Sequence, residues 1–187
     1  LSHSALAEEE DKTLKAVTVT ATQDAPDGYR ASKTRVGKVA QDPHDIPQAI
    51  TTVTRALLAE QDASSLREAM RNVAGLSFNA AEGGRSGDNM NLRGFYTFGD
   101  MYLDGVRDTA QYNREVFNLE QVDVLRGAAA MLFGRGQAGG VINQVSKTPM
   151  LYGINKVETS VGTDGYLELK ADLNQRIGET TALRLNV

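Results

Sequence analysis

One glycine-rich segment has the spacing of a phosphate-binding motif. Residues 134–141, GRGQAGGV, satisfy the G-x-G-x-x-G pattern of dinucleotide-binding domains and its kinase-type extension with a final valine. A phosphate site needs a strand before the glycines and a helix after them, so that the phosphate rests on the helix N-terminus. Here the apolar run at residues 128–133 predicts a helix before the glycines, and the alternation from Val141 predicts a strand after them. Because this order is reversed and the chain lacks H-R-D and D-F-G segments, the glycines are interpreted as a tight turn, partly with positive φ, where two backbones approach closely.

Other residues that could support catalysis or metal binding are sparse. The chain has no cysteine, which excludes a disulfide framework and a thiolate metal site. Its two histidines, His3 and His44, are far apart and have no ligand pattern around them. Asp104 and Asp108 form an acidic pair on a predicted loop, where they are interpreted as turn formers. No Ser-His-Asp or Cys-His set is present, so the sequence predicts neither an enzyme nor an intrinsic metal or cofactor.

Charge also excludes one class of partner. The net charge is −4 over 187 residues and the arginines are scattered along the chain. There is therefore no basic face for nucleic acid.

The elements around the glycine turn follow from periodicity. Val122 and Val124 flank Asp123 in alternation, which predicts a half-buried strand before the short helix at 128–133. Upstream, Ile50 and Val53 fit another strand, and residues 55–61 fit a helix. Further strands are predicted at 76–79, 90–93 and 101–103. Helices and strands in this mixture predict a small α+β domain with a mixed sheet.

A second helix has clear start and stop signals. Ser65 and Glu68 have the spacing of a capping box. Leu66, Met70 and Val73 form an apolar stripe that predicts core positions, and Gly75 is placed as a C-terminal stop.

The last part of the chain has a different pattern. Apolar and polar residues alternate at 157–161, 167–174 and 183–187, with turn signals at 162–165 and near Gly178. One face of each strand is apolar and the other is charged, as in the strands of an outer-membrane β-barrel. The alternative is a soluble sheet with one wet face.

Several segments together resemble the plug domain of TonB-dependent outer-membrane receptors, especially the ferric-siderophore receptors. The resemblance covers about residues 14–149, in the family's order and spacing, through DIPQAITTVT, SLREAMRNVAG, MNLRGF, YLDGVRD, LEQVDVLRG and LFGRGQAGGVINQVSKTP. One departure is Ala128, where the family usually has proline after LRG. Proline at a first helical position is helpful but not required, so this departure does not weaken the resemblance.

The resemblance implies a domain organisation. Residues 1–7, which end in Ala-Leu-Ala, are expected to be a signal-peptide remnant, with an ordinary polar N-terminus as the alternative. Residues 8–45 are expected to form a flexible N-terminal arm, residues 46–149 the α+β plug, and residues 150–187 the first antiparallel strands of a transmembrane β-barrel. Because a barrel of about 22 strands cannot close with three, the chain is expected to be part of a longer receptor.

Within the arm, a Val/Thr alternation lies where the family has its TonB box. That segment pairs by strand addition with TonB, the inner-membrane energy-transducing partner. The alternative is an edge strand of the plug. The predicted box consists of Leu14, Lys15, Ala16, Val17, Thr18, Val19, Thr20 and Ala21.

In the resembled receptors, loops of the plug line an extracellular ligand pocket. Ferric catecholates are anionic and have planar rings, which suit arginine charge and aromatic faces; the alternative is that the aromatic residues cover the domain's own core. The predicted ligand-binding residues are Arg85, Tyr96, Phe98, Gln111, Tyr112 and Arg114.

Two further arginines have a different implied role. In the family, arginines at the positions of Arg93 and Arg126 form buried ion pairs with glutamates of the barrel wall. The alternative is that both are solvated.

The resemblance implies TonB-dependent uptake of a ferric siderophore, of catecholate type by the GDN, NLRGF and DGVRD segments, across a Gram-negative outer membrane. The implied partners are TonB, the siderophore and outer-membrane lipid around the barrel. Two alternatives stay open: a receptor for another cargo such as cobalamin or a sugar, and a soluble binding module built only from the plug.

Overall fold

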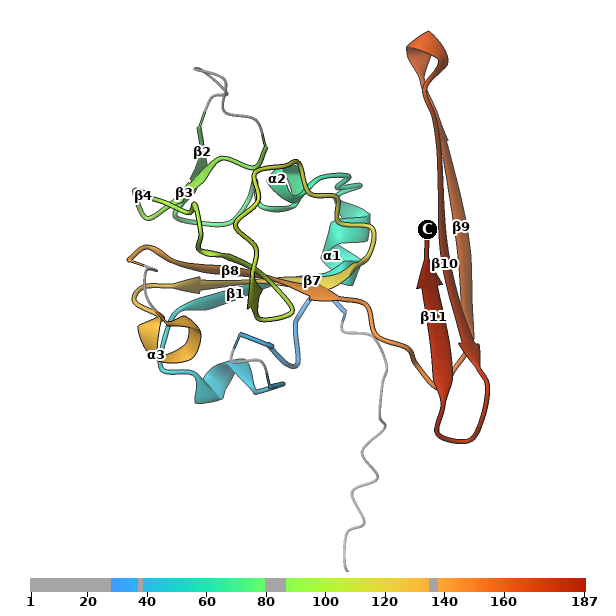
Figure 1. Cartoon of the computed structure of the whole chain (residues 1–187), viewed down its shortest axis with the longest axis horizontal. Coiled ribbons are helices and arrows are strands. Elements are labelled where there is room, and N and C mark those ends of the chain that lie inside the picture. The colour runs from blue at the N-terminus through green and yellow to red at the C-terminus, as the bar shows by residue number, and fades with distance from the viewer. Residues whose placement is uncertain (1–27, 37–38, 80–86, 135–137) are drawn as a thin grey trace, which may run out of the picture.

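The computed structural model describes residues 28–36, 39–79, 87–134 and 138–187. These residues form a five-stranded mixed sheet, a three-stranded sheet beside it, and a three-stranded C-terminal sheet that stands apart from both (Figure 1). The predicted TonB box and Arg85 lie outside the described residues.

The five-stranded sheet confirms the predicted mixed sheet. The long strands β7 and β8 lie at its centre, β5 runs parallel to β8, and the remaining neighbours are antiparallel. In sheet order the strands are β1 (Ile50–Thr54), β7 (Leu119–Arg126), β8 (Gly140–Ser146), β5 (Met101–Leu103) and β6 (Val106–Arg107).

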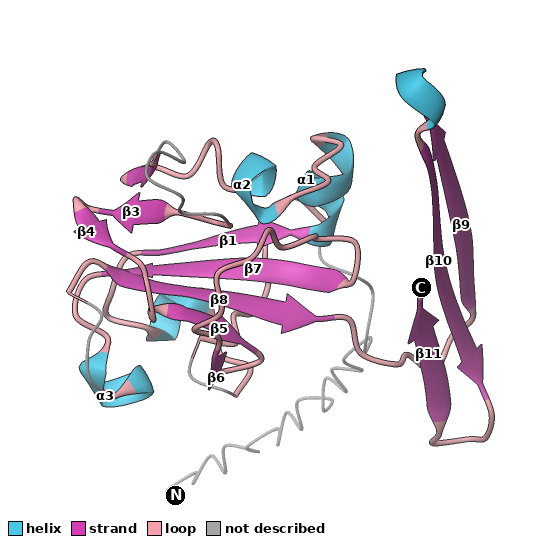
Figure 2. Ribbon diagram, turned by 45° about the horizontal axis from the view of Figure 1, so that its top comes forward, coloured by secondary structure: helices cyan, strands magenta, loops and turns pink. Residues whose placement is uncertain are grey.

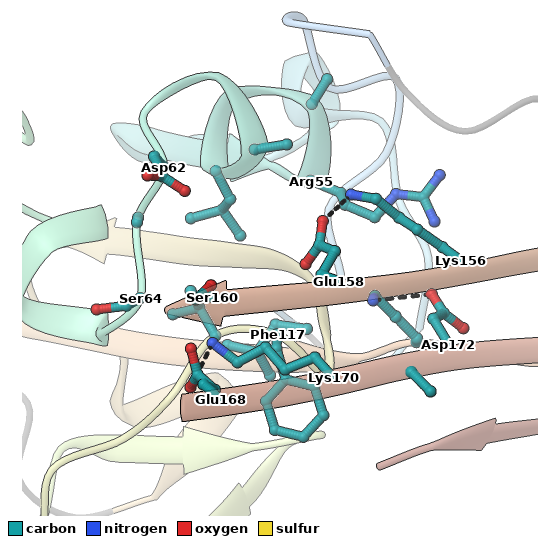
Figure 3. A pocket seen from close by; sticks show the side chains of 18 of the residues that line it. Arg55, Asp62, Ser64, Phe117, Lys156, Glu158, Ser160, Glu168, Lys170 and Asp172 are labelled. Atoms are coloured by element: carbon teal, nitrogen blue, oxygen red, sulfur yellow. Dashed lines mark hydrogen bonds and ion pairs between the residues drawn. The ribbon is translucent and has the colours of Figure 1, made fainter. Parts of the chain in front are cut away.

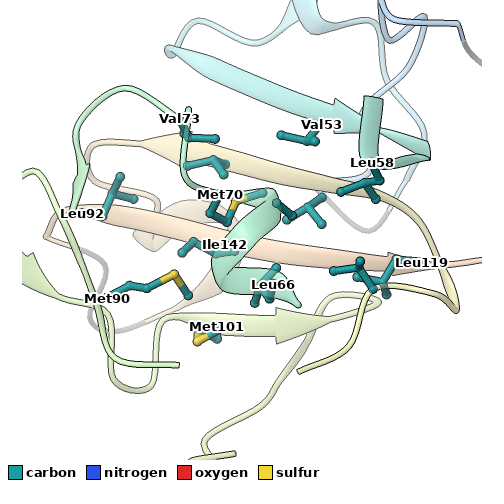
Figure 4. Packing of buried hydrophobic residues seen from close by; sticks show 14 residues of the cluster. Val53, Leu58, Leu66, Met70, Val73, Met90, Leu92, Met101, Leu119 and Ile142 are labelled. Atoms are coloured by element: carbon teal, nitrogen blue, oxygen red, sulfur yellow. The ribbon is translucent and has the colours of Figure 1, made fainter. Parts of the chain in front are cut away.

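Apolar residues cover both faces of this sheet. On one face, helices α1 (Arg55–Glu60) and α2 (Leu66–Ala69) bury a cluster that includes Leu66, Met70 and Ile142 (Figures 2 and 4). On the other face, helix α3 (Ala130–Phe133) and the chain near Val36 cover a second, smaller cluster. Because both faces are covered, β7 and β8 are buried along almost their whole length.

Helix α2 begins as predicted and ends earlier. The Ser65 hydroxyl accepts from the Glu68 N–H, and the Glu68 carboxylate accepts from the Ser65 N–H, which completes the capping box. The predicted continuation to Val73 is wrong, because the Arg71 and Val73 N–H groups bond to carbonyls three residues back, in tighter turns. The stripe residues Met70 and Val73 are nevertheless buried, as predicted.

The smaller sheet contains β2 (Leu76–Phe78), β3 (Met90–Leu92) and β4 (Phe95–Tyr96). The two-residue strands β4 and β6 were not expected from periodicity. Each is formed by a tight hairpin in which both central residues have positive φ: Arg93 and Gly94 in one, Asp104 and Gly105 in the other.

The described part of the glycine-rich segment passes close to other backbone segments, as the sequence analysis predicted. A Cβ atom on Gly139 would lie 2.2 Å from the Leu92 carbonyl oxygen, and one on Gly140 would lie 2.0 Å from the Leu125 carbonyl oxygen. Helix α3 precedes this turn and β8 follows it, which is the reverse of a phosphate-binding order.

Three antiparallel strands follow the domain: β9 (Ile154–Val161), β10 (Leu167–Arg176) and β11 (Ala182–Asn186). Their outer face carries exposed Val and Leu side chains, and the opposite face carries charged and amide side chains. Within the described residues, no helix has the length and apolar character needed to cross a membrane.

The plug boundary at residue 46 stays a prediction, but described residues before it also pack on the sheet. Val36 is fully buried, and Thr34 forms a backbone bridge with Gln41. The buried Asp123 carboxylate on β7 accepts from the Arg35 N–H at 2.8 Å, so the segment is fixed to the centre of the sheet.

Candidate ligand-binding surface

Two neighbouring loops expose aromatic side chains at one end of the domain. Tyr96 and Phe98 stack with ring centroids 6.0 Å apart and planes 10° apart, and they are 36% and 56% exposed. The Tyr96 hydroxyl donates to Asn89 Oδ1 at 2.7 Å, and Gln111 Nε2 donates to the Tyr96 hydroxyl at 2.9 Å. Tyr96 is therefore fixed at its polar end while one part of its ring stays open to solvent.

The second aromatic position is supported by a buried arginine. Tyr112 is 45% exposed, whereas Arg114 is only 3% exposed and its guanidinium carbon lies 4.2 Å from the centroid of the Tyr112 ring. The Tyr112 hydroxyl donates to Asp108 at 2.9 Å, and Arg114 Nε donates to the same carboxylate at 3.0 Å. The Tyr112 ring is thus held at its face by Arg114 and at its hydroxyl by Asp108.

The carboxylates under this surface respond differently to burial. Burial acts to raise the pKa of Asp108, but hydrogen bonds from Tyr112 and Arg114 outweigh it and lower the pKa below its usual value. For Asp88, burial raises the pKa, and the bonds and charge of Arg114 oppose it only in part. Burial and the hydrogen bond to Asp108 raise the pKa of Tyr112, so this hydroxyl stays protonated at neutral pH.

The structure therefore joins four of the predicted ligand residues in one exposed surface. Tyr96 at the end of β4, Phe98 just after it, and Gln111 and Tyr112 on the loop after β6 are all exposed, and the bond between Gln111 and Tyr96 joins the two segments. Arg114 lies beneath them. The sequence analysis missed Asp88 and Asn89 as partners, although both belong to the GDN segment that it singled out.

Arg93, one of the two arginines predicted to pair with a barrel wall, lies close to the backbone next to the other, Arg126. A Cβ atom on Gly127 would lie 3.6 Å from Arg93 Nη1, which places the Arg93 guanidinium beside the chain that follows Arg126. Arg126 donates to Thr51 Oγ1 at 2.6 Å and to the Ala74 carbonyl at 3.1 Å. Neither arginine has an ion-pair partner among the described residues.

A cleft of about 1000 Å³ separates α1 from the polar face of β9 and β10 (Figure 3). Six of the charged side chains that line it form three pairs: Lys170 with Glu168 at 2.8 Å, Lys147 with Asp172 at 2.9 Å, and Lys156 with Glu158. Of the predicted ligand residues that the structure describes, none lines this cleft. No group of three or more His, Asp or Glu residues in the described part of the chain could hold a metal ion.

A buried ion-pair network joins the domain to the C-terminal strands. Asp172 on β10 accepts from Arg184 Nη2 at 2.7 Å and from Lys147 Nζ at 2.9 Å, and the Arg184 side chain is 1% exposed. Asn174, on the same face of β10, bonds to both backbone groups of Met150. These contacts join β10 to Lys147 and Met150 in the segment that follows β8, and the sequence analysis did not predict them.

Comparison with known proteins identifies the fold. Residues 42–141, more than half of the chain, match the family model described as the TonB-dependent Receptor Plug Domain. The crystal structure of the ferric-catecholate import receptor Fiu from Escherichia coli K12, in its closed form, is similar with a TM-score of 0.77 and 34% identity over 87% of this chain and 23% of that one.

Two further relatives show the same match. The probable TonB-dependent receptor BfrD of Bordetella pertussis is 40% identical over 144 residues, 76% of this chain and 19% of that protein. The siderophore receptor PiuA of Acinetobacter baumannii superposes with a TM-score of 0.76 and 30% identity over 85% of this chain and 23% of the other. The chain thus spans about a quarter or less of the length of the relatives it matches.

Proposed function

This chain belongs to the plug family of TonB-dependent receptors, and we propose that its parent protein imports a ferric siderophore of catecholate type across a Gram-negative outer membrane. The plug blocks the pore and supplies part of the ligand site, and no covalent chemistry takes place. The observation that carries the proposal is the exposed aromatic surface of Tyr96, Phe98 and Tyr112 on a chain 34% identical to a ferric-catecholate import receptor.

Aromatic faces suit this cargo. The rings of a catecholate are flat and apolar on their faces, so they stack on Tyr and Phe side chains. Gln111 adds an amide at the edge of the same surface. Arg85 is proposed as the source of positive charge for the anionic complex, because it is the one predicted cation in these loops other than the buried Arg114.

The other predicted roles are part of the same proposal. Arg93 and Arg126 pair with glutamates of the barrel wall, which is consistent with two guanidinium groups that have no acidic partner among the described residues. Residues 150–187 are the first barrel strands, with exposed Val and Leu side chains toward lipid. Leu14 to Ala21 act as the TonB box, within a periplasmic arm at residues 8–45 whose last part, around Val36, packs on the sheet. This arm follows a signal remnant at 1–7.

Retention of radioiron by the purified parent receptor in detergent tests this proposal. Iron(III) tris-catecholate is compared with iron(III)–desferrioxamine, a hydroxamate. We expect the catecholate to be retained and Tyr112→Ala to weaken its binding by about tenfold, because a base–aromatic or ring–aromatic stack contributes about 1–3 kcal/mol. Tyr29→Ala is the control, since Tyr29 is exposed and lies outside the proposed surface.

Retention of the hydroxamate alone would contradict the catecholate assignment. Retention of neither complex would contradict the siderophore assignment, and cobalamin or a sugar would be tested next.

A further inference from the structure

We propose that Arg114 and the tripeptide Gly87–Asp88–Asn89 are positioning residues: they hold the aromatic surface in its binding geometry and do not contact the ligand. This inference rests on the proposed function, since it concerns the same surface. It assigns Arg114 a different role from the direct ligand contact expected from the sequence.

The hydrogen-bonding capacity of Arg114 is used inside the protein. Its Nε donates to Asp108, its Nη1 donates to Asp88 at 3.4 Å and to the Tyr112 carbonyl at 3.3 Å, and its Nη2 donates to the Ala110 carbonyl at 2.7 Å. Arg114 therefore shares its charge between two carboxylates, and Arg67 is a further cation whose charge reaches Asp88, so the cluster carries no excess of positive charge. An anionic ligand would gain no attraction from it, whereas the planar fork of arginine is well suited to join several acceptors.

Asp88 connects the two loops in both directions. Its carboxylate accepts from the Arg114 N–H at 2.9 Å and from the Arg114 guanidinium, and its own N–H donates to the Tyr112 carbonyl at 3.1 Å. The Asp88 side chain is 2% exposed, so these bonds are protected from water. Asp88 is thus hydrogen-bonded to the backbone of both Tyr112 and Arg114, the residues on either side of Asn113.

Gly87 and Asn89 complete the contact on either side of Asp88. A Cβ atom on Gly87 would lie 2.6 Å from the Tyr112 nitrogen and 2.8 Å from the Gln111 carbonyl carbon, so only glycine allows this close approach. The φ of Gly87, +91°, also favours glycine. Asn89 is 2% exposed, and its Oδ1 accepts from the Tyr96 hydroxyl. Each residue of the tripeptide therefore fixes a different part of the aromatic surface.

The assembly is also fixed to the hydrophobic core. The Arg114 carbonyl accepts from the N–H of Leu66 at 2.8 Å, at the first residue of α2, and Ser65 forms a backbone bridge with Glu115. Leu66 is fully buried among the core residues. The loop that presents Gln111 and Tyr112 is therefore held at a defined place relative to the sheet, which lowers the entropy that a ligand would have to remove on binding.

The test uses the parent receptor with Arg114→Met, Arg114→Lys and Gly87→Ala. Arg71→Met is the matched control, because Arg71 is exposed and lies outside this assembly. Hydrogen exchange of peptides that cover residues 87–89 and 108–114 is measured first, without ligand, together with peptides from β7 and β8 as a check that the plug is folded. Binding of iron(III) tris-catecholate is measured on the same samples.

We expect faster exchange in both loops of Arg114→Met and Gly87→Ala, unchanged exchange in β7 and β8, and about tenfold weaker binding, because the ligand would have to immobilise the newly mobile side chains. Arg114→Lys should lie between these variants and the control, because it keeps the charge and loses the fork. A direct charge contact with the ligand would instead give near-normal binding for Arg114→Lys and unchanged loop exchange for Arg114→Met, and either result would overturn the inference.

Tyr112→Ala separates the two proposals. If it weakens catecholate binding and Arg114→Met and Gly87→Ala do not, the positioning role is wrong and the ligand surface stands. If Tyr112→Ala has no effect while both loops exchange faster in Arg114→Met, the proposed ligand surface is wrong, and with it the positioning of that surface for a ligand.

Discussion

Asp123 holds the chain near Arg35 on the central sheet, and its substitution should loosen that contact by a predictable amount. The carboxylate is fully buried and accepts from the Arg35 N–H at 2.8 Å, from Thr52 Oγ1 at 2.6 Å and from Gln121 Nε2 at 3.0 Å. Among the described residues it has no ion-pair partner, so neutral donors alone stabilise the buried charge.

The number of orphaned donors sets the size of the effect. Asp123→Ala leaves these three donors, and the Thr34 side chain that also bonds to the carboxylate, without this acceptor, and each buried donor left unsatisfied costs about 1–3 kcal/mol. The Thr52 hydroxyl rotates, and Gln121 Nε2 also donates to the Lys33 carbonyl, so the Arg35 N–H dominates the cost. We expect Asp123→Ala to lower the free energy of unfolding by about 3 kcal/mol, and Asp123→Asn, which keeps one oxygen, by about 1 kcal/mol.

The pKa of Asp123 gives the same prediction a pH dependence. Burial raises the pKa, and the hydrogen bonds from Thr52, Arg35 and Gln121 lower it only in part. An acid whose pKa is higher in the folded state binds its proton more tightly there than in the unfolded chain. Its protonation therefore stabilises the folded state fully at a pH below the unfolded-state pKa, and this stabilisation is lost as the pH rises through the folded-state pKa. The stability of the wild type relative to Asp123→Asn should therefore increase on acidification from neutral pH to below 3.8.

Urea unfolding of the chain in mild detergent, followed by circular dichroism, measures both effects. A local probe is available because the chain has no cysteine: Val36→Cys introduces a single thiol at a fully buried position, and its labelling rate reports release of the segment. Equal costs for Asp123→Ala and Asp123→Asn, or a wild-type advantage that shrinks on acidification, would refute the reasoning.

Three further substitutions test the packing of the fold. Gly140→Ala should destabilise the chain by more than about 3 kcal/mol, because its Cβ would overlap the Leu125 carbonyl oxygen, whereas Gly134→Ala, also at positive φ but with no described atom within 4 Å of the added Cβ, should cost only about 1–2 kcal/mol in urea unfolding. Ser65→Ala removes the capping box of α2 and should cost about 1 kcal/mol; a loss below about 0.3 kcal/mol would show that tertiary packing alone sets the start of this helix. Asp172→Ala leaves the buried Arg184 and Lys147 without their shared acceptor and should cost about 3 kcal/mol with faster hydrogen exchange in β10 and β11, while Glu158→Ala, in an exposed pair with Lys156, should change stability by less than about 1 kcal/mol.

Features with a local physical cause could be predicted from the sequence. The capping box of Ser65 and Glu68 depends on residues three apart. The strands β7 and β8 were predicted from alternation, but the expectation that β7 is half-buried was wrong, because both faces of the sheet are covered. The turn between α3 and β8 follows from its glycines. The predicted end of α2 was wrong because the apolar stripe at residues 66, 70 and 73 fits either a helix or a series of turns. Both conformations bury the same side chains.

The residues that could form a ligand surface were also recognisable in sequence, but their roles were not. Tyr96, Phe98, Gln111 and Tyr112 stand on loops between predicted strands, and aromatic residues there indicate binding. Exposure separates them from Arg114, whose burial depends on two carboxylates elsewhere in the chain. No periodicity links those three residues.

By itself the sequence determined the order of the elements, the alternation of the C-terminal strands and the membership of a receptor family, because each depends on the short-range spacing of apolar, turn and capping residues. Only the tertiary structure decided which charges are paired. Asp88 reaches Arg114 across 26 positions, Arg35 reaches Asp123 across 88, and Lys147 reaches Asp172 across 25. Such pairs form where the folded chain removes charges and N–H groups from water and each must find a partner, and that requirement acts on distance in space rather than along the sequence.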